Sequence, residues 1–172
     1  MYEDVKLGKM EGLLREIVQH YNHGKYWKYR SKVVDPHQGT KVGDTLRLLY
    51  IKKADAYNNA SMGTHRNFGA TFLTPPILPH GLNGIIVSHN AVIGERCRIF
   101  HQVTIGEGRG GAPIIGNDVL IGAGAKIIGN VKIGNRVKIA AGCVIMQDIA
   151  DDVIVLPGEN KLIYKGKGGI SE

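Results

Sequence analysis

The side chains best suited to acid–base chemistry are two of the seven histidines. His80 stands between Pro79 and Gly81, directly ahead of an apolar run that ends at Val87. A neutral imidazole can take a proton from a hydroxyl near neutral pH, which is the role of a general base. His80 is therefore our candidate for a base, against the ordinary alternative of a histidine in a surface loop.

His101 is the second histidine of interest, and it lies in another apolar stretch further along the chain. We expect it either to bind an acceptor or to support the base, and the alternative is an outward-facing residue of a strand. Asn83, close after His80, is a further candidate for the same two roles.

The remaining residues with reactive side chains predict no other chemistry. Cys97 and Cys143 occupy small apolar positions of the repeat described below, so we expect packed side chains and not nucleophiles. His20 and His23 lack other ligands at metal-site spacing, so no metal site is predicted. With two cysteines and no export signal at the start of the sequence, we expect a cytoplasmic protein.

The elements that must position these residues follow a period of six. From Val87 onward an aliphatic residue recurs every six positions, with one interruption, and a small or medium apolar residue follows four positions after nearly every one. The leading aliphatics are Val87, Ile93, Ile99, Ile105, Ile115, Ile121, Ile127, Ile133, Ile139 and Ile145. This period fits neither an amphipathic helix nor an alternating strand. It indicates short strands and turns, three to a coil, stacked as a parallel β-helix with the aliphatics inside.

Glycine is unusually frequent, with 24 residues. It follows the leading aliphatic at Gly94, Gly106, Gly116, Gly122 and Gly134. We expect these glycines at turns that need a positive φ. The interruption runs from Ile105 to Ile115, a gap of ten residues instead of six. Four extra residues must therefore leave the coil as a loop, which carries Arg109 and is a natural place for function.

Three helical stretches are expected before the repeat. The first has an apolar stripe formed by Leu13, Leu14, Ile17 and Val18. The others are expected over 26–34, ending before Asp35-Pro36, and over 45–57. Such helices would cap the open N-terminal end of the solenoid, because the end coil of a repeat stack otherwise exposes its core.

The repeat, together with Leu78-Pro-His-Gly-Leu-Asn-Gly-Ile-Ile-Val and Ile121-Gly-Ala-Gly-Ala-Lys-Ile-Ile-Gly-Asn, resembles the hexapeptide-repeat acyltransferases. The most similar branch is that of the serine acetyltransferases and their relatives in polysaccharide gene clusters. The resemblance implies a mainly β fold, a left-handed parallel β-helix of hexapeptide repeats with a short N-terminal α-helical cap. It also implies acetyl-CoA as co-substrate and a homotrimer with active sites between neighbouring solenoids.

The predicted organisation therefore has three parts. A helical cap covers 1–60, the left-handed β-helix covers 61–164 and a flexible tail covers 165–172. Residues 60–86 are expected to form a distorted first coil and 153–158 a last strand.

The resemblance also assigns roles to residues that match the family's motifs. His80 matches the general base. The positions that match acetyl-CoA-binding residues are Gly106, Gly122, Ala123, Gly124, Lys138 and Ala141. Arg109 in the loop is a further candidate for a CoA phosphate or an anionic sugar, with a solvated charge as the alternative.

Departures from the serine acetyltransferase pattern bear on the acceptor. Pro79 stands where these enzymes have an Asp before the base, and Gly111-Ala112 stand where they have Arg-His. The carboxylate that would orient the base is not found, because no Asp or Glu occurs between Asp55 and Glu95. Since the charged groups that hold an amino acid are missing, we favour a sugar or glycan hydroxyl.

The sequence thus predicts an acetyl-CoA-dependent O-acetyltransferase acting on a sugar or polysaccharide-precursor hydroxyl. Direct transfer needs a base, a backbone N–H for the oxyanion and a groove that aligns the substrates, with neither metal nor acyl-enzyme. Serine O-acetyltransferase and N-acylation of an amino-sugar remain alternatives. A non-catalytic trimeric β-helix scaffold is an alternative of another class.

The net charge is +7, and much of it falls in the first third of the chain. No aromatic-and-basic motif accompanies the charge, so we expect no nucleic-acid partner. Weak peripheral contact with an anionic membrane is one interpretation of the basic helices, and a solvated surface is the other.

Overall fold

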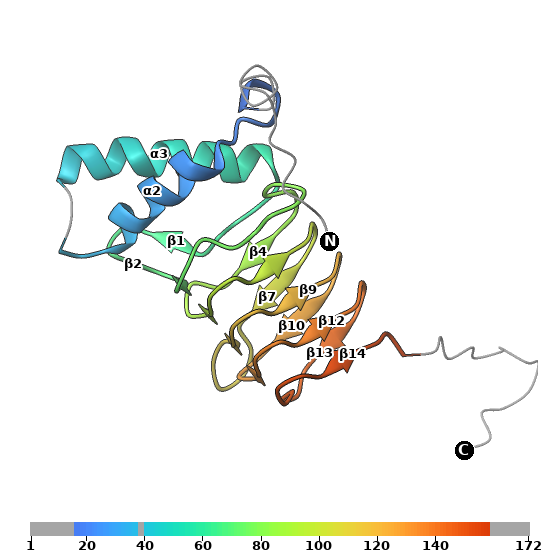
Figure 1. Cartoon of the computed structure of the whole chain (residues 1–172). Coiled ribbons are helices and arrows are strands. Elements are labelled where there is room, and N and C mark those ends of the chain that lie inside the picture. Colours follow the sequence, from blue (N-terminus) through green and yellow to red (C-terminus); the bar gives the residue numbers. More distant parts are fainter. Residues whose placement is uncertain (1–15, 38–39, 159–172) are drawn as a thin grey trace, which may run out of the picture.

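The computed structural model describes residues 16–37 and 40–158, and the expected tail and the residues Leu13 and Leu14 lie outside these ranges. Helices α2 (His23–Val34) and α3 (Lys41–Tyr57) lie across one end of a stack of coils (Figure 1). Residues 16–19 are also helical. In the described part of the chain, no helix combines the length and the apolar character needed to cross a membrane.

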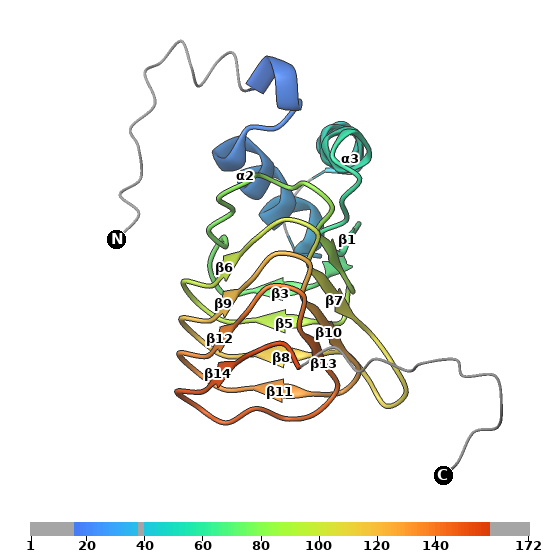
Figure 2. The same cartoon turned by 90° about the vertical axis from the view of Figure 1, so that its right-hand side faces the viewer.

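The stack of coils is a left-handed parallel β-helix, as predicted. Its strands are two or three residues long: β1 Thr64–His65, β2 Phe68–Gly69, β3 Thr71–Phe72, β4 Ile86–Val87, β5 Val92–Ile93, β6 Arg98–Ile99, β7 Thr104–Gly106, β8 Ile114–Ile115, β9 Leu120–Ile121, β10 Lys126–Ile128, β11 Lys132–Ile133, β12 Lys138–Ile139, β13 Val144–Ile145 and β14 Ile154–Val155. Figure 2 shows the coils stacked along the prism.

Three four-stranded parallel sheets form the faces of the prism. We name them the β3 face (β3-β5-β8-β11), the β4 face (β4-β7-β10-β13) and the β6 face (β6-β9-β12-β14). Ile115 lies opposite Ile133 on the next coil, and Ile93 lies opposite Ile115 across the interruption. All ten leading aliphatics are buried, and so are the small residues four positions later, except the partly buried Ile149. The predicted inward register is therefore confirmed.

The glycines after the leading aliphatics serve close stacking and not turn geometry. Gly94, Gly116, Gly122 and Gly134 have no positive φ. A Cβ at Gly94 would overlap the backbone of Gly116, and a Cβ at Gly116 would overlap the backbone of Gly134. The predicted positive φ at these glycines is wrong, because the left-handed position of each turn lies two residues later, at Arg96, Asp118, Gly124 and Arg136.

Helices α2 and α3 begin earlier than the predicted Tyr26 and Thr45. The side-chain oxygens of Asn22 and Thr40 accept hydrogen bonds from backbone amides of the first helical turn. Such caps satisfy amides that have no partner inside the helix, so the helix starts directly after the cap. Both helices end where the sequence predicted.

Buried polar contacts fasten the helices to each other and to the first coil. The Tyr26 hydroxyl donates to Asp55 Oδ1 at 2.6 Å, which joins α2 to α3. Arg30, only 3% exposed, donates to the carbonyls of Met62 and Ala70 and so joins α2 to the β-helix. Burial raises the pKa of Asp55 to about 6 and lowers that of Arg30 to about 10. The predicted capping role of the helices is confirmed.

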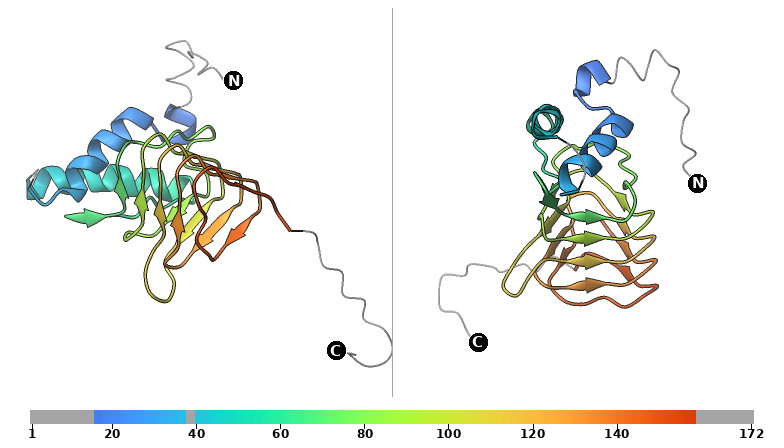
Figure 3. Two further views of the ribbon diagram at one scale, coloured as in Figure 1. Left: turned by 60° about the horizontal axis from the view of Figure 1, so that its bottom comes forward. Right: turned by 90° about the vertical axis from the view of Figure 1, so that its left-hand side faces the viewer.

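The irregular parts of the chain lie where the repeat predicted them. The first coil contains an antiparallel β1–β2 hairpin, and β3 then joins the β3 face by pairing with β5. The extra residues between β7 and β8 form a loop in which Gly108 and Gly111 exchange backbone hydrogen bonds of 3.0 and 3.3 Å. The loop projects from the prism in both views of Figure 3. A short last strand, β14, is present as expected.

Candidate active site

One edge of the prism is lined by small residues. It joins the β6 face to the β4 face through the turns 100–103, 122–125 and 140–143, and we call it the small-residue edge. The second turn reads Gly-Ala-Gly-Ala and the third Ala-Ala-Gly-Cys. A path without bulky side chains therefore runs along this edge from the turn that carries His101.

The other two edges are different in kind. At the edge between the β3 and β6 faces, Arg96 donates two hydrogen bonds of 2.7 Å to Asp118, and Arg136 makes the same paired contact with Asp152 at 2.6 and 2.7 Å. These ion pairs link adjacent coils, so this charged edge has an evident structural role. The third edge, between the β4 and β3 faces, carries the projecting loop with Arg109.

His80 and His101 meet at the small-residue edge. The two Nδ1 atoms are 2.6 Å apart, a hydrogen-bond distance, and the Phe100 ring stands edge-on to the His80 ring with centroids 5.6 Å apart. His80 is exposed and His101 is half-buried. The structure thus brings the two candidate histidines together at one edge, whereas their chemical roles stay predictions.

Backbone hydrogen bonds between successive coils align most of the other predicted residues with this pair, along the small-residue edge. The carbonyl of Asn83 accepts from Gln102 at 2.9 Å, which brings Asn83 to the same edge. The carbonyl of His101 accepts from Gly124 at 3.0 Å. On the next coil, the backbone amide of Gly142 donates to the carbonyl of Ala123 at 2.9 Å, which aligns the third turn with the second. The structure thus places the candidates of the small-residue edge in one column, namely Asn83, His101, Gly122, Ala123, Gly124 and Ala141.

Three candidates lie away from that column. Gly106 ends β7, and its carbonyl accepts from Gly129 at 2.9 Å beside the projecting loop. Arg109 is exposed in that loop. Lys138 is exposed on the β6 face, directly before Ile139 and the third turn of the small-residue edge. Within one chain, Gly106 and Arg109 therefore lie at a different edge from His80.

The hydrogen-bond partner of the candidate base is an imidazole and not a carboxylate. In the described ranges, the acidic residues nearest in sequence are engaged elsewhere: Asp55 with Tyr26 in the cap and Glu95 with Arg96 at the charged edge. Sequence reasoning noted the missing carboxylate, but the 2.6 Å contact with His101 required the three-dimensional register.

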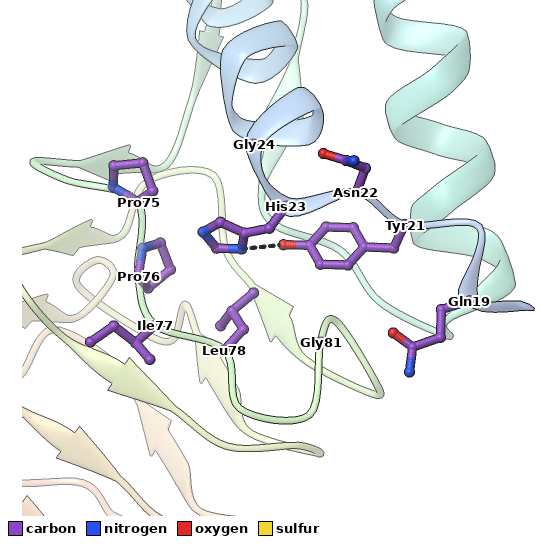
Figure 4. Close-up of a pocket in the computed structure, with 10 residues that line it drawn as sticks. All are labelled: Gln19, Tyr21, Asn22, His23, Gly24, Pro75, Pro76, Ile77, Leu78 and Gly81. Carbon is purple, nitrogen blue, oxygen red and sulfur yellow. Dashed lines mark hydrogen bonds between the residues drawn. The ribbon is translucent and has the colours of Figure 1, made fainter. Parts of the chain in front are cut away.

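A cavity of about 550 Å³ lies beside the segment that carries His80 (Figure 4). It separates the start of α2 from residues 75–81, and the Tyr21 hydroxyl lies 2.7 Å from His23 Nδ1 at its wall. Leu78 and Gly81, which flank His80 in the chain, also line it. His23 is exposed, and nothing local in the sequence indicates its place at the wall of this cavity.

The cysteines pack as predicted. Cys97 and Cys143 are both buried, and burial raises the pKa of the Cys97 thiol, which disfavours the thiolate. Among residues 16–37 and 40–158, no three His, Cys, Asp or Glu side chains converge as metal ligands would.

Comparisons with known proteins agree with this architecture. Residues 112–147 match the family described as bacterial transferase hexapeptide (six repeats). The chain is 37% identical over 93 residues to the serine acetyltransferase of Synechococcus elongatus, a match that covers 51% of this chain and 37% of the relative. It is 34% identical over 95 residues to the serine acetyltransferase of Helicobacter pylori, which covers 52% of this chain and 54% of the relative.

The solved structures extend the likeness to the fold. The crystal structure of the Neisseria gonorrhoeae serine acetyltransferase in complex with serine aligns with a TM-score of 0.57 and 27% identity, covering 88% of this chain and 55% of that one. The chain thus spans about a third to a half of the length of the curated relatives it matches. The chain contains hexapeptide repeats and is similar to serine acetyltransferases, as its sequence predicted.

Proposed function

We propose that this hexapeptide-repeat chain transfers an acetyl group from acetyl-CoA to a hydroxyl, with His80 as the general base. One observation carries the proposal. An exposed histidine, bonded to a second histidine, stands at the head of a column of small residues, in a chain similar to serine acetyltransferases.

The chemistry needs few parts. His80 Nε2 takes the proton of the acceptor hydroxyl as its oxygen attacks the acetyl carbon. A backbone N–H stabilises the oxyanion, and Gly106 is the residue that the family resemblance favours for the thioester end. The C–S bond then breaks, and the imidazolium returns its proton to the leaving thiolate. The products are the acetyl ester and CoA.

The small-residue edge supports the choice of donor. The turns with Ala123 and Ala141 offer backbone and methyl groups along a path two coils long, which suits an extended pantetheine arm. Lys138, exposed beside the third turn, and Arg109 are our candidates for the phosphates at the nucleotide end.

The separation of the candidates supports assembly as a homotrimer. His80 lies at the small-residue edge, whereas Gly106 and Arg109 lie at the loop edge of the same chain. A second copy that presents its loop edge to the small-residue edge would unite the two sets in one groove. A binding groove of this kind excludes water and aligns the substrates, which one isolated prism edge does not.

Serine is the acceptor that the comparisons favour. The relatives are named serine acetyltransferases, and the Neisseria protein is described in complex with serine. The initial preference for a sugar has less support from these relatives. A sugar hydroxyl stays the second candidate because of one observation. Pro79 stands where the family has an acidic residue before the base, and neither residues 78–84 nor the three turns of the small-residue edge contain a carboxylate that could hold an ammonium group.

The test measures thiol release from acetyl-CoA by the purified full chain. L-serine and a panel of free and nucleotide-linked sugars serve as acceptors, with His80→Ala as the control and mass spectrometry to identify the ester. Release that depends on serine supports the first acceptor, and release that depends on a sugar supports the second. If no acceptor raises thiol release above that of the His80→Ala control, the chain is not this enzyme. The alternative of a non-catalytic scaffold is then favoured.

A further inference from the structure

The Nδ1–Nδ1 contact between His80 and His101 restricts where the protons of this pair lie. At 2.6 Å, one Nδ1 must donate a hydrogen and the other must accept it. The neutral pair therefore has one ring with a bare Nε2 and one ring with an Nε2–H. Because a base needs the bare nitrogen, the direction of this single hydrogen bond decides which ring can act.

We propose that His101 is a positioning residue that accepts the Nδ1–H of His80 and thereby leaves His80 Nε2 bare as the base. The inference rests on the proposed function of His80. It assigns to a neutral imidazole the task that a carboxylate performs for a catalytic histidine elsewhere, which is to fix its tautomer and orientation.

The surroundings favour this direction. His80 is exposed, so its Nε2 can meet a substrate, while His101 is half-buried and is fixed by the hydrogen bond from Gly124 to its carbonyl. The edge-on Phe100 ring limits rotation of the His80 imidazole about its side-chain bonds. His101 is thus the more buried residue of the two, and the next coil holds its backbone, as suits a positioning residue.

A neutral partner has a consequence for proton balance. When His80 takes the acceptor's proton, the imidazolium still donates Nδ1–H to the neutral His101. A second proton on the pair would leave a hydrogen on both Nδ1 atoms. Neither atom could then accept a hydrogen bond, and the contact would break. In the described part of the chain, the segments 78–84, 99–103 and 122–125 contain no other titratable side chain. The cations Arg98 on β6 and Lys126 on β10 lie next to these turns in the chain. From the start of α2, the titratable Tyr21 and His23 face the segment that carries His80 across the cavity.

Two substitutions separate positioning from packing. His101→Asn keeps a carbonyl oxygen near the place of Nδ1 and can still accept from His80, whereas His101→Leu fills similar space without an acceptor. We expect His101→Asn to keep turnover within about tenfold of the parent and His101→Leu to lose about 100-fold in kcat, with KM for acetyl-CoA unchanged. His101→Asp should move the acid limb of the pH profile upward, because an opposite charge favours the imidazolium.

The decisive readout is the tautomer of His80, measured on the full-length protein from the ¹⁵N chemical shifts of its imidazole. We expect Nδ1–H with bare Nε2 in the parent and in His101→Asn, and the Nε2–H form in His101→Leu. A parent protein with Nε2–H on His80, or equal turnover and equal shifts in the Asn and Leu variants, would overturn the proposal. Because the shifts need no turnover, an inactive parent with the expected tautomer would reject the proposed function and keep the histidine pair.

Discussion

The carbonyl oxygen of His101 accepts a hydrogen bond of 3.0 Å from the backbone amide of Gly124, one coil further along the prism. This bond places Ala123 directly beyond the histidine pair, on the path that we assign to acetyl-CoA. The methyl group of Ala123 is half-buried, so a larger side chain there would fill the path and not extend into open solvent.

We therefore expect Ala123→Leu to raise KM for acetyl-CoA at least about tenfold, which corresponds to about 1.4 kcal/mol of binding. The matched control is Ala150→Leu, an exposed alanine at the charged edge. Steady-state kinetics with varied acetyl-CoA make the measurement. The same KM in both variants would show that the donor does not pass along the small-residue edge.

The stacking glycines predict a stability effect that depends on position. Gly116→Ala would drive a Cβ into the backbone of Gly134, so we expect a loss of about 1–3 kcal/mol in the free energy of unfolding. Gly158 has open space around a built Cβ, and Gly158→Ala should change stability by less than about 0.5 kcal/mol. Urea denaturation of both variants tests this difference, and equal stability of the two would contradict close coil stacking.

The contacts between coils show which features of the fold could be predicted from the sequence and which could not. The sixfold period predicts which side of each strand is buried, because that depends on spacing alone. What a residue meets on the next coil depends on the register, which is 18 residues between regular coils, 22 where the loop intervenes and 16 at the last coil. It also depends on which residue takes the left-handed turn. The reason for glycine at Gly94 and Gly116 was therefore missed, as was the pairing of Arg136 with Asp152.

The features of the candidate site also fall into those that the sequence predicts and those that it does not. A histidine before an apolar strand is visible in a motif, so His80 was found directly. The contact of His101 with His80 joins turns of adjacent coils, and the chain between them includes the irregular segment after Leu78, whose course no repeat predicts. The helix starts were missed for a simpler reason, since the caps Asn22 and Thr40 lie outside the apolar pattern that defined those helices.

The projecting loop is predicted to serve activity more than stability. Gly108 and Gly111 close it with two hydrogen bonds, so deletion of residues 108–111 restores the spacing of six without removing a buried side chain. We expect the deletion variant to keep its thermal midpoint within a few degrees and to lose at least about tenfold in kcat/KM. A variant that unfolds but whose remaining folded fraction turns over normally would mark the loop as structural.

Asp55 gives the cap a predictable pH dependence. Its carboxyl is protonated up to about pH 6 in the folded protein, because burial disfavours the charged form, but only up to about pH 4 in the unfolded chain. The folded state therefore binds more protons between these values, and stability falls as pH rises through this window, by up to about 3 kcal/mol.

Chemical denaturation of the parent and of Asp55→Asn between pH 4 and 7.5 measures this contribution. The parent should lose stability relative to the variant as the pH rises, since the amide that replaces the carboxyl in the variant has no charge to develop. Parallel curves for the two proteins would show that Asp55 ionises in the folded protein as it does in water.

The most direct test of the central claim compares His80→Ala with the parent in acetyl transfer to whichever acceptor proves active. We predict that kcat falls by about 10²- to 10⁴-fold, as expected when a general base is lost, while the thermal midpoint and the affinity for CoA stay unchanged. Turnover by His80→Ala at the rate of the parent would contradict the assignment of the histidine pair as the site of acetyl transfer.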